Sequence, residues 1–462
     1  MLSLAACALP IETASPRFTA PARFVATAAP APAAAPDPAW WREFGAPDLD
    51  RLMAAAMQRN LDISAAVARL RQADEALRIT GAQLLPVVGA DASVARTRST
   101  SRNPGTPAEA GRRYGGSIFA SYEIDFWGGL AAQREAARAT VLASEFAIGT
   151  VTLATQSAVA GTLFDLLGAQ EQLAVQQENL AAAERTLTIL RGRLSVGTAT
   201  GLDVAQQETV VAQQRAQMPA LRRAIEANAF ALATLTGQLP ADVTVAAQRL
   251  GAIRVPEIAA GLPAEVLARR PDVRLAEANL TVAAADITAA RAALYPALTL
   301  TAEGGLQSLA LETLLRPGST IYALSAGIAQ SIFDGGARRA RVALNRARQD
   351  ELLAAYQRAL LAALQDTETG LSALRNDRDL VALQGARVEA AQRAYAVADA
   401  QFRAGTIDLL ILLNTQSSLF SARVALAQAQ GSRLQSAVAL YVALGGGWVI
   451  GEQRTARMRP QP

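Results

Sequence analysis

The sequence lacks histidine altogether and contains no lysine, so all 44 of its basic residues are arginines. Without histidine the chain has neither a Ser-His-Asp triad nor an imidazole ligand for a metal ion. Without lysine it has no Walker-type phosphate loop and no Schiff-base residue. The single cysteine, Cys7, excludes an internal disulfide and a cysteine metal cluster. We therefore expect a protein that is not an enzyme and that uses no cofactor.

Aromatic residues and net charge are also scarce. Only 5% of the residues are aromatic although 51% are hydrophobic, and alanine makes up the difference. Alanine-rich helices can approach one another closely and pack as long bundles. The net charge of +4 comes from interspersed charges, so the chain has no basic stripe for nucleic acid. The short pairs Arg112-Arg113 and Arg338-Arg339 are expected at exposed surfaces or lipid headgroups.

Long apolar runs are missing as well. No stretch approaches the roughly 20 consecutive apolar residues that a membrane-spanning helix needs. If the chain enters a membrane, it is therefore expected to do so as a β-barrel.

An internal repeat is the main feature that is present. Asp62 opens a segment that starts again at Asp272, 210 residues later, and Gly197 corresponds to Gly405, 208 residues later. This period is too long for a solenoid unit. It indicates one elongated body built from two similar halves, an arrangement that membrane conduits often have.

Each half contains two segments in which apolar and polar residues alternate. They are predicted as strands over 87–98, 115–127, 296–306 and 320–333. A period of two is typical of a sheet with one apolar face, and no apolar helix face is obvious that would cover it as in a soluble protein. Four strands cannot close a barrel by themselves, and bare edges are not tolerated in lipid. The strand count therefore predicts an oligomer, and three copies would supply twelve strands, an even number that is enough for a water-filled lumen.

Very long helices follow the strands in both halves. We expect helices over 129–194, 203–236, 336–403 and 408–444. The longest would extend about 95 Å and pack like a coiled coil. Gly197 and Gly405 are expected as left-handed turn residues at the tips of two helical hairpins. Asp203 and Asp408 are placed to cap the returning helices.

Three segments carry a resemblance to a known family. They are Trp40-Trp41 with Phe44-Gly45, the segment from Arg269-Arg270-Pro271-Asp272 to Tyr295-Pro296, and Ala437 to Trp448. Together they are similar to TolC-like outer-membrane efflux factors, most closely to the lipidated NodT-type branch that serves tripartite RND drug pumps. The resemblance covers roughly residues 40 to 450.

The resemblance implies an α+β membrane protein in which a trimer forms a twelve-stranded outer-membrane β-barrel, continued by a periplasmic α-helical barrel. It implies a passive efflux channel whose partners are a periplasmic adaptor (membrane fusion) protein, an inner-membrane RND transporter and outer-membrane lipid. Nucleic acid is not an expected partner. Two alternatives stay open: a duct for type I protein secretion or metal-ion export, and a soluble coiled-coil scaffold, which would leave the strands unexplained.

The N-terminus resembles a lipoprotein box, in which Leu4-Ala5-Ala6 precede Cys7. A lipidated Cys7 fits the lipidated branch, although only six residues precede it and none is basic. Either the start codon is placed too late and Cys7 is lipidated, or Cys7 is an unmodified cysteine; we favour the first, because Cys7 is the single cysteine of the sequence.

The tips of the helical hairpins are the expected docking surface for the adaptor. The matching residues are Val196, Gly197, Thr198, Ala404, Gly405 and Thr406. The alternative is that the two glycines only make turns.

The channel gate is expected at the start of the last long helix. The resemblance places an aperture of leucines at Leu410, beside Asp408 and Asn414. Members of the family often have an Asp and, three residues later, an Arg that hold the tip shut, whereas this chain has Asn414 and Ser417. The closed state would then depend on Leu410 packing and on hydrogen bonds of Asn414. Alternatively, the other residues of 409–413 are ordinary helix core.

These expectations divide the chain into six parts. They are a signal remnant ending at Cys7 (1–7), an extended tether and equatorial segment (8–45), repeat 1 (46–240), an equatorial segment between the repeats (241–262), repeat 2 (263–446) and a tail (447–462).

Overall fold

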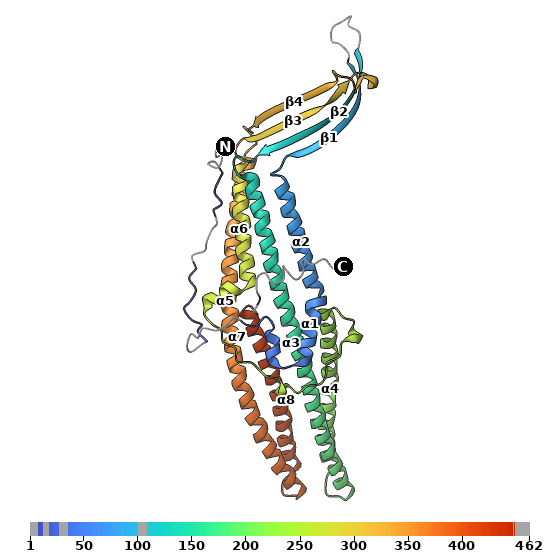
Figure 1. Ribbon diagram of the computed structural model, residues 1–462. Helices are drawn as coiled ribbons and strands as arrows, with labels where there is room; N and C mark the ends of the chain where they lie inside the picture. Colours follow the sequence, from blue (N-terminus) through green and yellow to red (C-terminus); the bar gives the residue numbers. More distant parts are fainter. Residues whose placement is uncertain (1–7, 13–17, 27–35, 100–108, 447, 449–462) are drawn as a thin grey trace. The chain divides into compact units, whose positions relative to one another are not determined.

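The computed structural model describes residues 8–12, 18–26, 36–99, 109–446 and 448 (Figure 1). The chain divides into two compact units. The strand unit comprises Met1–Arg17, Ala68–Glu145 and Leu275–Gln357, and the helical unit comprises Phe18–Val67, Phe146–Arg274 and Arg358–Pro462. The longer helices are α1 (Pro47–Arg59), α2 (Leu61–Ala82), α3 (Gly129–Ser195), α4 (Gly201–Thr236), α6 (Pro271–Ala292), α7 (Ala337–Arg403) and α8 (Leu409–Ala443), with a short α5 (Pro263–Arg269).

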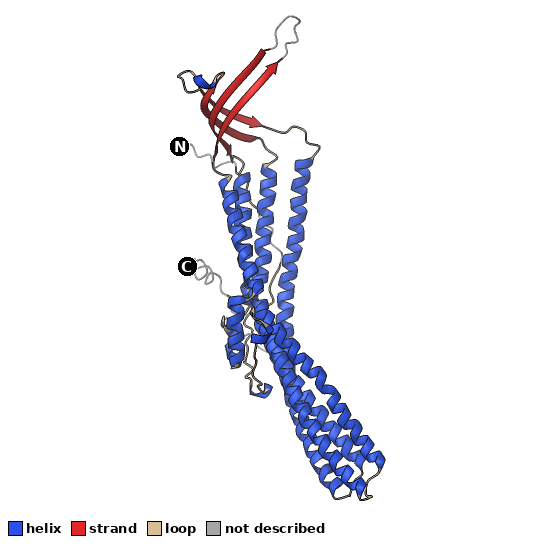
Figure 2. Ribbon diagram, turned by 90° about the vertical axis from the view of Figure 1, so that its right-hand side faces the viewer, coloured by secondary structure: helices blue, strands red, loops and turns tan. Residues whose placement is uncertain are grey.

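The expected four strands form one antiparallel sheet in the order β1-β2-β3-β4 (Figure 2). Their bounds are Val87–Ser99, Glu109–Ile124, Ala297–Ser308 and Thr320–Ala329. Every strand pairs with the next one in an uninterrupted register, so the two repeats meet at the β2–β3 ladder in the middle of the sheet. The outer edges of β1 and β4 have no partner strand among the described residues.

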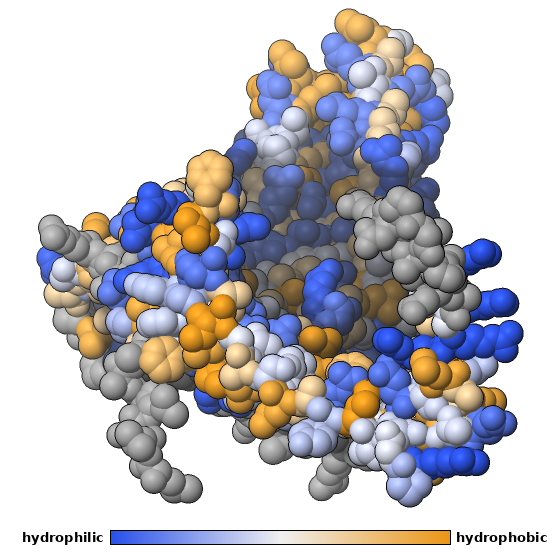
Figure 3. Space-filling view, turned by 90° about the horizontal axis from the view of Figure 1, so that it is seen from above, coloured by the Kyte–Doolittle hydropathy of each residue, from blue (hydrophilic) through white to orange (hydrophobic). Residues whose placement is uncertain are grey.

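One face of this sheet is apolar over most of its length. The register aligns Val88, Ala120, Ala302 and Leu324, and residues directly opposite one another lie on the same face. The large side chains of this face remain exposed in the single chain, with Leu324 82% exposed and Tyr322 89% exposed. Figure 3, seen from above, shows hydrophobic side chains at the surface among hydrophilic ones. An uncovered apolar face of this kind requires an apolar surrounding.

Two strands end earlier than their alternating patterns predict. The second strand was expected over 115–127, but β2 runs from Glu109 to Ile124, and β4 ends at Ala329 rather than at 333. Asp125 explains the first difference, because its carboxylate accepts hydrogen bonds from the N–H groups of Leu130 and Ala131 (2.9 and 2.7 Å) and thereby starts α3. Capping a helix requires the chain to leave the sheet.

Asp334 has the same role before α7. Its carboxylate accepts hydrogen bonds from the N–H groups of Gly336 and Arg338 (2.9 and 3.2 Å), and these bonds lower the pKa of Asp334. The preceding residues 330–333 are irregular rather than a continued strand. Each strand–helix junction is therefore fixed by an aspartate cap, which an alternating hydrophobic pattern does not reveal.

The helices require a correction to the expectation that no segment is suited to cross a membrane. α3 and α8 each contain an 18-residue window that is apolar and long enough to do so by composition. Their many alanines raise the mean hydropathy without forming a run of large apolar side chains. More than half of the α3 window, 56%, is buried inside the chain, so packing between helices accounts for its apolar character.

The core of the helical unit is built around the aromatic residues near the N-terminus. Trp40 is fully buried and stacks on Tyr441 with ring centroids 5.0 Å apart. Phe44 packs against Phe164 of α3 (5.2 Å between centroids). Burial raises the pKa of Tyr441, as does the hydrogen bond that its hydroxyl donates to Glu43 (2.8 Å). This cluster joins α1, α3, α4 and α8.

The glycines after α8 turn the chain back onto α3. Gly445 (φ 88°) and Gly446 (φ 55°) adopt left-handed conformations and form a Schellman turn with the carbonyls of Val442 and Tyr441 (3.0 and 2.9 Å). Trp448 then packs on Phe146 (5.7 Å between centroids). A Cβ atom at Gly149 would lie 2.6 Å from the Trp448 ring, so this position needs glycine.

Arg270, in the motif Arg269-Arg270-Pro271-Asp272, joins three helices. Its guanidinium binds the Asp272 carboxylate through two hydrogen bonds (3.0 and 2.7 Å) and the Asp366 carboxylate of α7 (3.0 Å). It also donates to the carbonyl of Ala443 at the end of α8 (3.3 Å). The side chain is 11% exposed, so its charge depends on these partners for compensation.

A described piece of the N-terminal segment, residues 18–26, is held on α7. The Glu368 carboxylate accepts hydrogen bonds from the N–H groups of Val25 and Ala26 (2.5 and 2.9 Å), and Arg375 donates to the carbonyl of Ala26 (3.1 Å). Phe24 is 1% exposed in a cluster with Val266 and Leu440. This part of the N-terminal segment is therefore fastened to the helical unit by the buried Phe24 side chain and by backbone hydrogen bonds to Glu368 and Arg375.

Replacement of Arg270 by Met is expected to lower the thermal unfolding midpoint of the detergent-solubilised protein by several degrees. The change leaves two carboxylates and a carbonyl without their donor, which costs about 2–4 kcal/mol. Arg348→Met is the matched control, because its ion pair with Glu351 is exposed and contributes at most about 0.5 kcal/mol. Equal midpoints for the two variants would contradict the role of Arg270.

Candidate functional site

The tips of the two helical hairpins share one backbone geometry. Gly197 (φ 76°) and Gly405 (φ 74°) are left-handed, as expected for turn residues. Thr198 donates its N–H to the carbonyl of Arg193 (2.9 Å), and Thr406 donates to that of Gln401 (3.0 Å). Both tips are thus Schellman turns, which satisfy the last carbonyls of α3 and α7. The two hairpins, α3–α4 and α7–α8, are visible in Figure 1.

The tips also expose apolar side chains to solvent. Val196 is 73% exposed, and Ala404 beside the second glycine is exposed as well. A Cβ atom added at either glycine would meet no atom within 4 Å, so the surface around the turns is open. The six residues expected to dock the adaptor therefore lie at two exposed turns of the same shape.

The helices that return from the tips begin with different caps. Thr200 caps α4, and its N–H donates to Asp203 (2.7 Å) while Asp203 donates its own N–H to the Thr200 hydroxyl (3.2 Å). This capping box starts α4 at Gly201, two residues before the expected start. Asp408 is itself the cap of α8 and accepts the N–H of Ile411 (3.0 Å). Within the single chain the Asp408 carboxylate therefore caps its own helix.

Leu410 is set apart from its neighbours by the rotation of α8. Leu409 and Leu412 are buried in a cluster with Leu190, Ala398 and Phe402, whereas Leu410 is 59% exposed. The expectation that the neighbours form helix core fits Leu409 and Leu412 but not Ile411, which is 46% exposed. One turn of the helix thus presents two apolar side chains outward.

Asn414 and Ser417 continue the exposed face that begins at Leu410. Both are exposed, and the carbonyl of Asn414 accepts a hydrogen bond from Ser418 (2.8 Å). Among the described residues the Asn414 amide has no hydrogen-bond partner, so any lock that it provides requires a second copy of the chain.

Arg193 is a residue that sequence reasoning missed. Its guanidinium donates to the carbonyls of Phe402 and Arg403 (2.8 and 3.0 Å) and lies 4.5 Å from the centre of the Phe402 ring. It thereby fastens the end of α3 to the end of α7. Its partners are more than 200 positions away in sequence, so no local pattern reveals them. The repeat offers one signal: the position that corresponds to Arg193 in the second half is Gln401, so the two halves differ there.

Cys7, expected to be lipidated, lies outside the described residues. Across the part of the chain that is described, no group of three or more His, Cys, Asp or Glu residues is arranged to hold a metal ion.

Residues 52–238 and 262–446 match the family described as outer membrane efflux protein, and the two matched segments correspond to the two repeats. The chain belongs to this outer membrane efflux protein family. It is 41% identical over 426 residues to the pyoverdine export outer membrane protein OpmQ of Pseudomonas aeruginosa, covering 90% of this chain and 89% of that protein.

Two further relatives support this assignment. The toluene efflux pump outer membrane protein TtgC of Pseudomonas putida is 32% identical over 413 residues, covering 88% of this chain and 85% of that protein. The solved outer-membrane channel OprN superposes with a TM-score of 0.89 at 27% identity, covering 95% of this chain and all of that chain. The chain is thus an outer-membrane efflux protein, with its sheet in the outer membrane and its helices in the periplasm.

Proposed function

We propose that three copies of the chain form a passive exit duct of a tripartite efflux system. The sheets of three copies join edge to edge into a twelve-stranded barrel, and the long helices form a periplasmic tunnel. An inner-membrane RND transporter supplies the energy, and a periplasmic adaptor connects it to the helical tips. No residue of the duct carries out a chemical step.

The observation that carries this proposal is the four-stranded sheet with an apolar face and two open edges. Unpaired N–H and C=O groups each cost several kcal/mol in hydrocarbon. The edges of β1 and β4 therefore need partners, and neighbouring copies of the same chain provide them symmetrically. A lone copy in the membrane would leave both edges unsatisfied.

The cargo follows the partner pump rather than the duct. OpmQ is named for pyoverdine export and TtgC for toluene efflux, although both align with nearly the whole chain. Such different molecules share little chemistry that a single lining could select. A duct for type I protein secretion or metal-ion export keeps the same architecture, and binding of the purified channel to an RND-type adaptor separates these alternatives.

The gate is formed by Leu410 from each copy. Exposed leucines that converge around an axis make an apolar constriction, which excludes water and ions. Leu409 and Leu412 hold α8 in place through their buried cluster, so the direction of Leu410 is fixed.

Substitution of Leu410 tests this constriction. Leu410→Ala is expected to raise single-channel conductance in planar bilayers. Smaller side chains leave a wider and less apolar opening, which stays filled with water more readily. Leu202→Ala is the matched control, since Leu202 is the repeat counterpart on α4 and is 66% exposed. A conductance change that is equal in both variants, or absent in both, would exclude Leu410 as the gate.

The closed state is held by Arg193 in place of the ion pair that Asn414 and Ser417 cannot form. Opening requires the α7–α8 hairpin to move relative to the α3–α4 hairpin, as a change between two packings of the helices. Arg193 joins the two hairpins through two hydrogen bonds and its contact with Phe402. Arg193 lies next to the hairpin tips, so binding of the adaptor there can break the contact between the two hairpins.

Arg193→Met is accordingly expected to raise the open probability of adaptor-free channels in bilayers. The lost hydrogen bonds and ring contact correspond to about 1–3 kcal/mol. Arg191→Met is the control, because its ion pair with Glu208 (2.7 Å) stays within the first hairpin. If Arg191→Met opens the channel as much as Arg193→Met does, the latch between hairpins is not the cause.

The docking surface can be tested without disturbing the turns. A bulky residue at Gly405 would strain a left-handed backbone, whereas Ala404 is exposed and does not have a positive φ. Ala404→Glu is expected to abolish adaptor binding and drug resistance while trimers still assemble. The control Ala396→Glu adds the same charge about two turns away on an exposed position of α7. Unaltered adaptor binding by Ala404→Glu would show that this glycine turn has only a structural role.

A further inference from the structure

Three arginines interrupt the apolar face of the sheet at one end. Arg96 and Arg98 of β1 and Arg112 of β2 occupy even-numbered positions, the same set that carries Val88 and Val94. Arg96 and Arg112 are directly opposite one another in the ladder. Directly opposite side chains have Cβ atoms about 5 Å apart, so two like charges there destabilise the sheet. An anion between the guanidinium groups would remove this repulsion.

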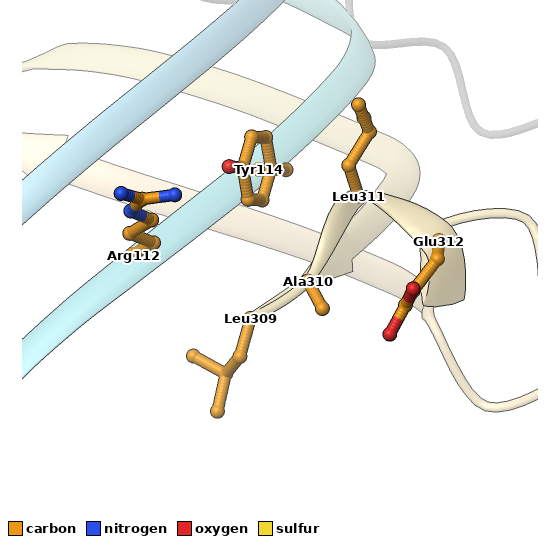
Figure 4. Close-up of a pocket in the computed structure, with 6 residues that line it drawn as sticks. All are labelled: Arg112, Tyr114, Leu309, Ala310, Leu311 and Glu312. Atoms are coloured by element: carbon orange, nitrogen blue, oxygen red, sulfur yellow. The ribbon is translucent and has the colours of Figure 1, made fainter.

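The chain does not supply that anion from the residues that are described. None of the ion pairs of the described residues includes Arg96, Arg98 or Arg112. Glu312 lines the same pocket as Arg112, yet the two form no ion pair. Figure 4 shows Arg112 and Tyr114 on β2, with Leu309, Ala310, Leu311 and Glu312 from the β3–β4 connection beside them. As far as the described residues go, the arginine cluster is therefore open to a ligand from outside the chain.

The position of the cluster relative to the membrane follows from the topology. β1 begins at Val87 directly after α2, and β2 ends at Ile124 directly before α3, so that end of the sheet faces the periplasm. The arginines are at the other end and face the exterior. From Tyr114 to Ile124 a strand extends about 34 Å, and a tilt of 40–45° reduces this to about 25 Å, the height of the apolar band of outer-membrane barrels.

Aromatic side chains mark both borders of this band. Trp127 stacks on Tyr295 (4.6 Å between centroids) at the periplasmic end, and Tyr114 lies at the outer end. Aromatic residues gather at both membrane–water borders of such barrels. Arg112, two residues beyond Tyr114, is thus at the depth of the outer-leaflet headgroups.

The pocket beside Arg112 has the chemistry of a lipid headgroup site. It has a volume of about 500 Å³ and is lined by Arg112, Tyr114, Leu309, Ala310, Leu311 and Glu312. Leu309 and Leu311 are exposed, which suits contact with acyl chains or the apolar side of a sugar. Guanidinium groups bind phosphate in a two-pronged manner, and two opposed arginines can hold one phosphate between them.

We propose that Arg96, Arg98 and Arg112, with the pocket lined by Tyr114, Leu309 and Leu311, bind the phosphate groups of an anionic glycolipid of the outer leaflet, of the lipid A type. The bound phosphate neutralises the opposed arginines and fixes the depth of the barrel in the outer leaflet. The site depends on the location of the sheet in the outer membrane and not on the gate or on the adaptor.

Native mass spectrometry of the full-length protein in detergent tests this site with bisphosphorylated lipid A as the probe. The wild type is expected to retain the lipid, and Arg96→Gln/Arg112→Gln is expected to bind it about tenfold or more weakly, as loss of charge-assisted bonds implies. Arg113→Gln is the matched control, because Arg113 is the next residue of the same strand and lies on the opposite face. It is expected to bind as the wild type does.

Two further measurements separate phosphate recognition from general lipid binding. Dephosphorylated lipid A is expected to bind the wild type as weakly as the double variant binds the intact lipid. Millimolar inorganic phosphate is expected to leave the lipid complex largely in place, because free phosphate cannot make the apolar contacts with Leu309 and Leu311 that the lipid makes. Retention of the lipid by the double variant, equal loss in Arg113→Gln, equal binding of the dephosphorylated lipid, or full displacement by free phosphate would each overturn the proposal. If the double variant does not fold, the two measurements on the wild type decide the question: binding of intact against dephosphorylated lipid A, and displacement by inorganic phosphate.

Discussion

The requirement that every backbone polar group in hydrocarbon be hydrogen-bonded governs this molecule. A single chain supplies four strands whose two outer edges are open, and its apolar sheet face has no cover in the described chain. Both deficits are satisfied together when copies of the chain close a barrel in lipid. The long helices are then free to continue into the periplasm, since their backbone bonds are internal. The architecture of the family follows from this one constraint.

The duplication gives the chain two helical hairpins of the same form, and sequence differences between the repeats give the two hairpins different contacts. Both helical hairpins end in the same Schellman turn around a left-handed glycine. At the position that precedes the turn, however, the first repeat has Arg193 and the second has Gln401. Only the arginine can reach across and bind the other hairpin. A single substitution therefore links two copies of an otherwise similar element.

Local physics explains why much of the fold could be predicted. A period of two identifies strands because alternate side chains face opposite sides of a sheet, and the register places the four apolar rows on one face. Glycine at a helix end predicts a left-handed turn because it lacks a Cβ. The same logic failed at Phe126 and Trp127, which continue the alternation although Asp125 already caps the next helix. The alternation of apolar and polar residues indicates which side chains share a face. It does not indicate where the backbone leaves the sheet and begins a helix.

The sequence by itself determined the four strands, the long helices and the glycine turns, because each depends on residues within a few positions of one another. It also determined the repeat, which is found by aligning the sequence with itself. Only the tertiary structure decided that Leu410 points outward while Leu409 and Leu412 are buried, since this depends on how α8 is rotated against Leu190 and Phe402. The partners of Arg193 and Arg270 were decided in the same way. The opposition of Arg96 and Arg112 follows from strand register, which a shift of one residue would abolish. Contacts between distant segments depend on rotation and register, and neither is written in a local pattern.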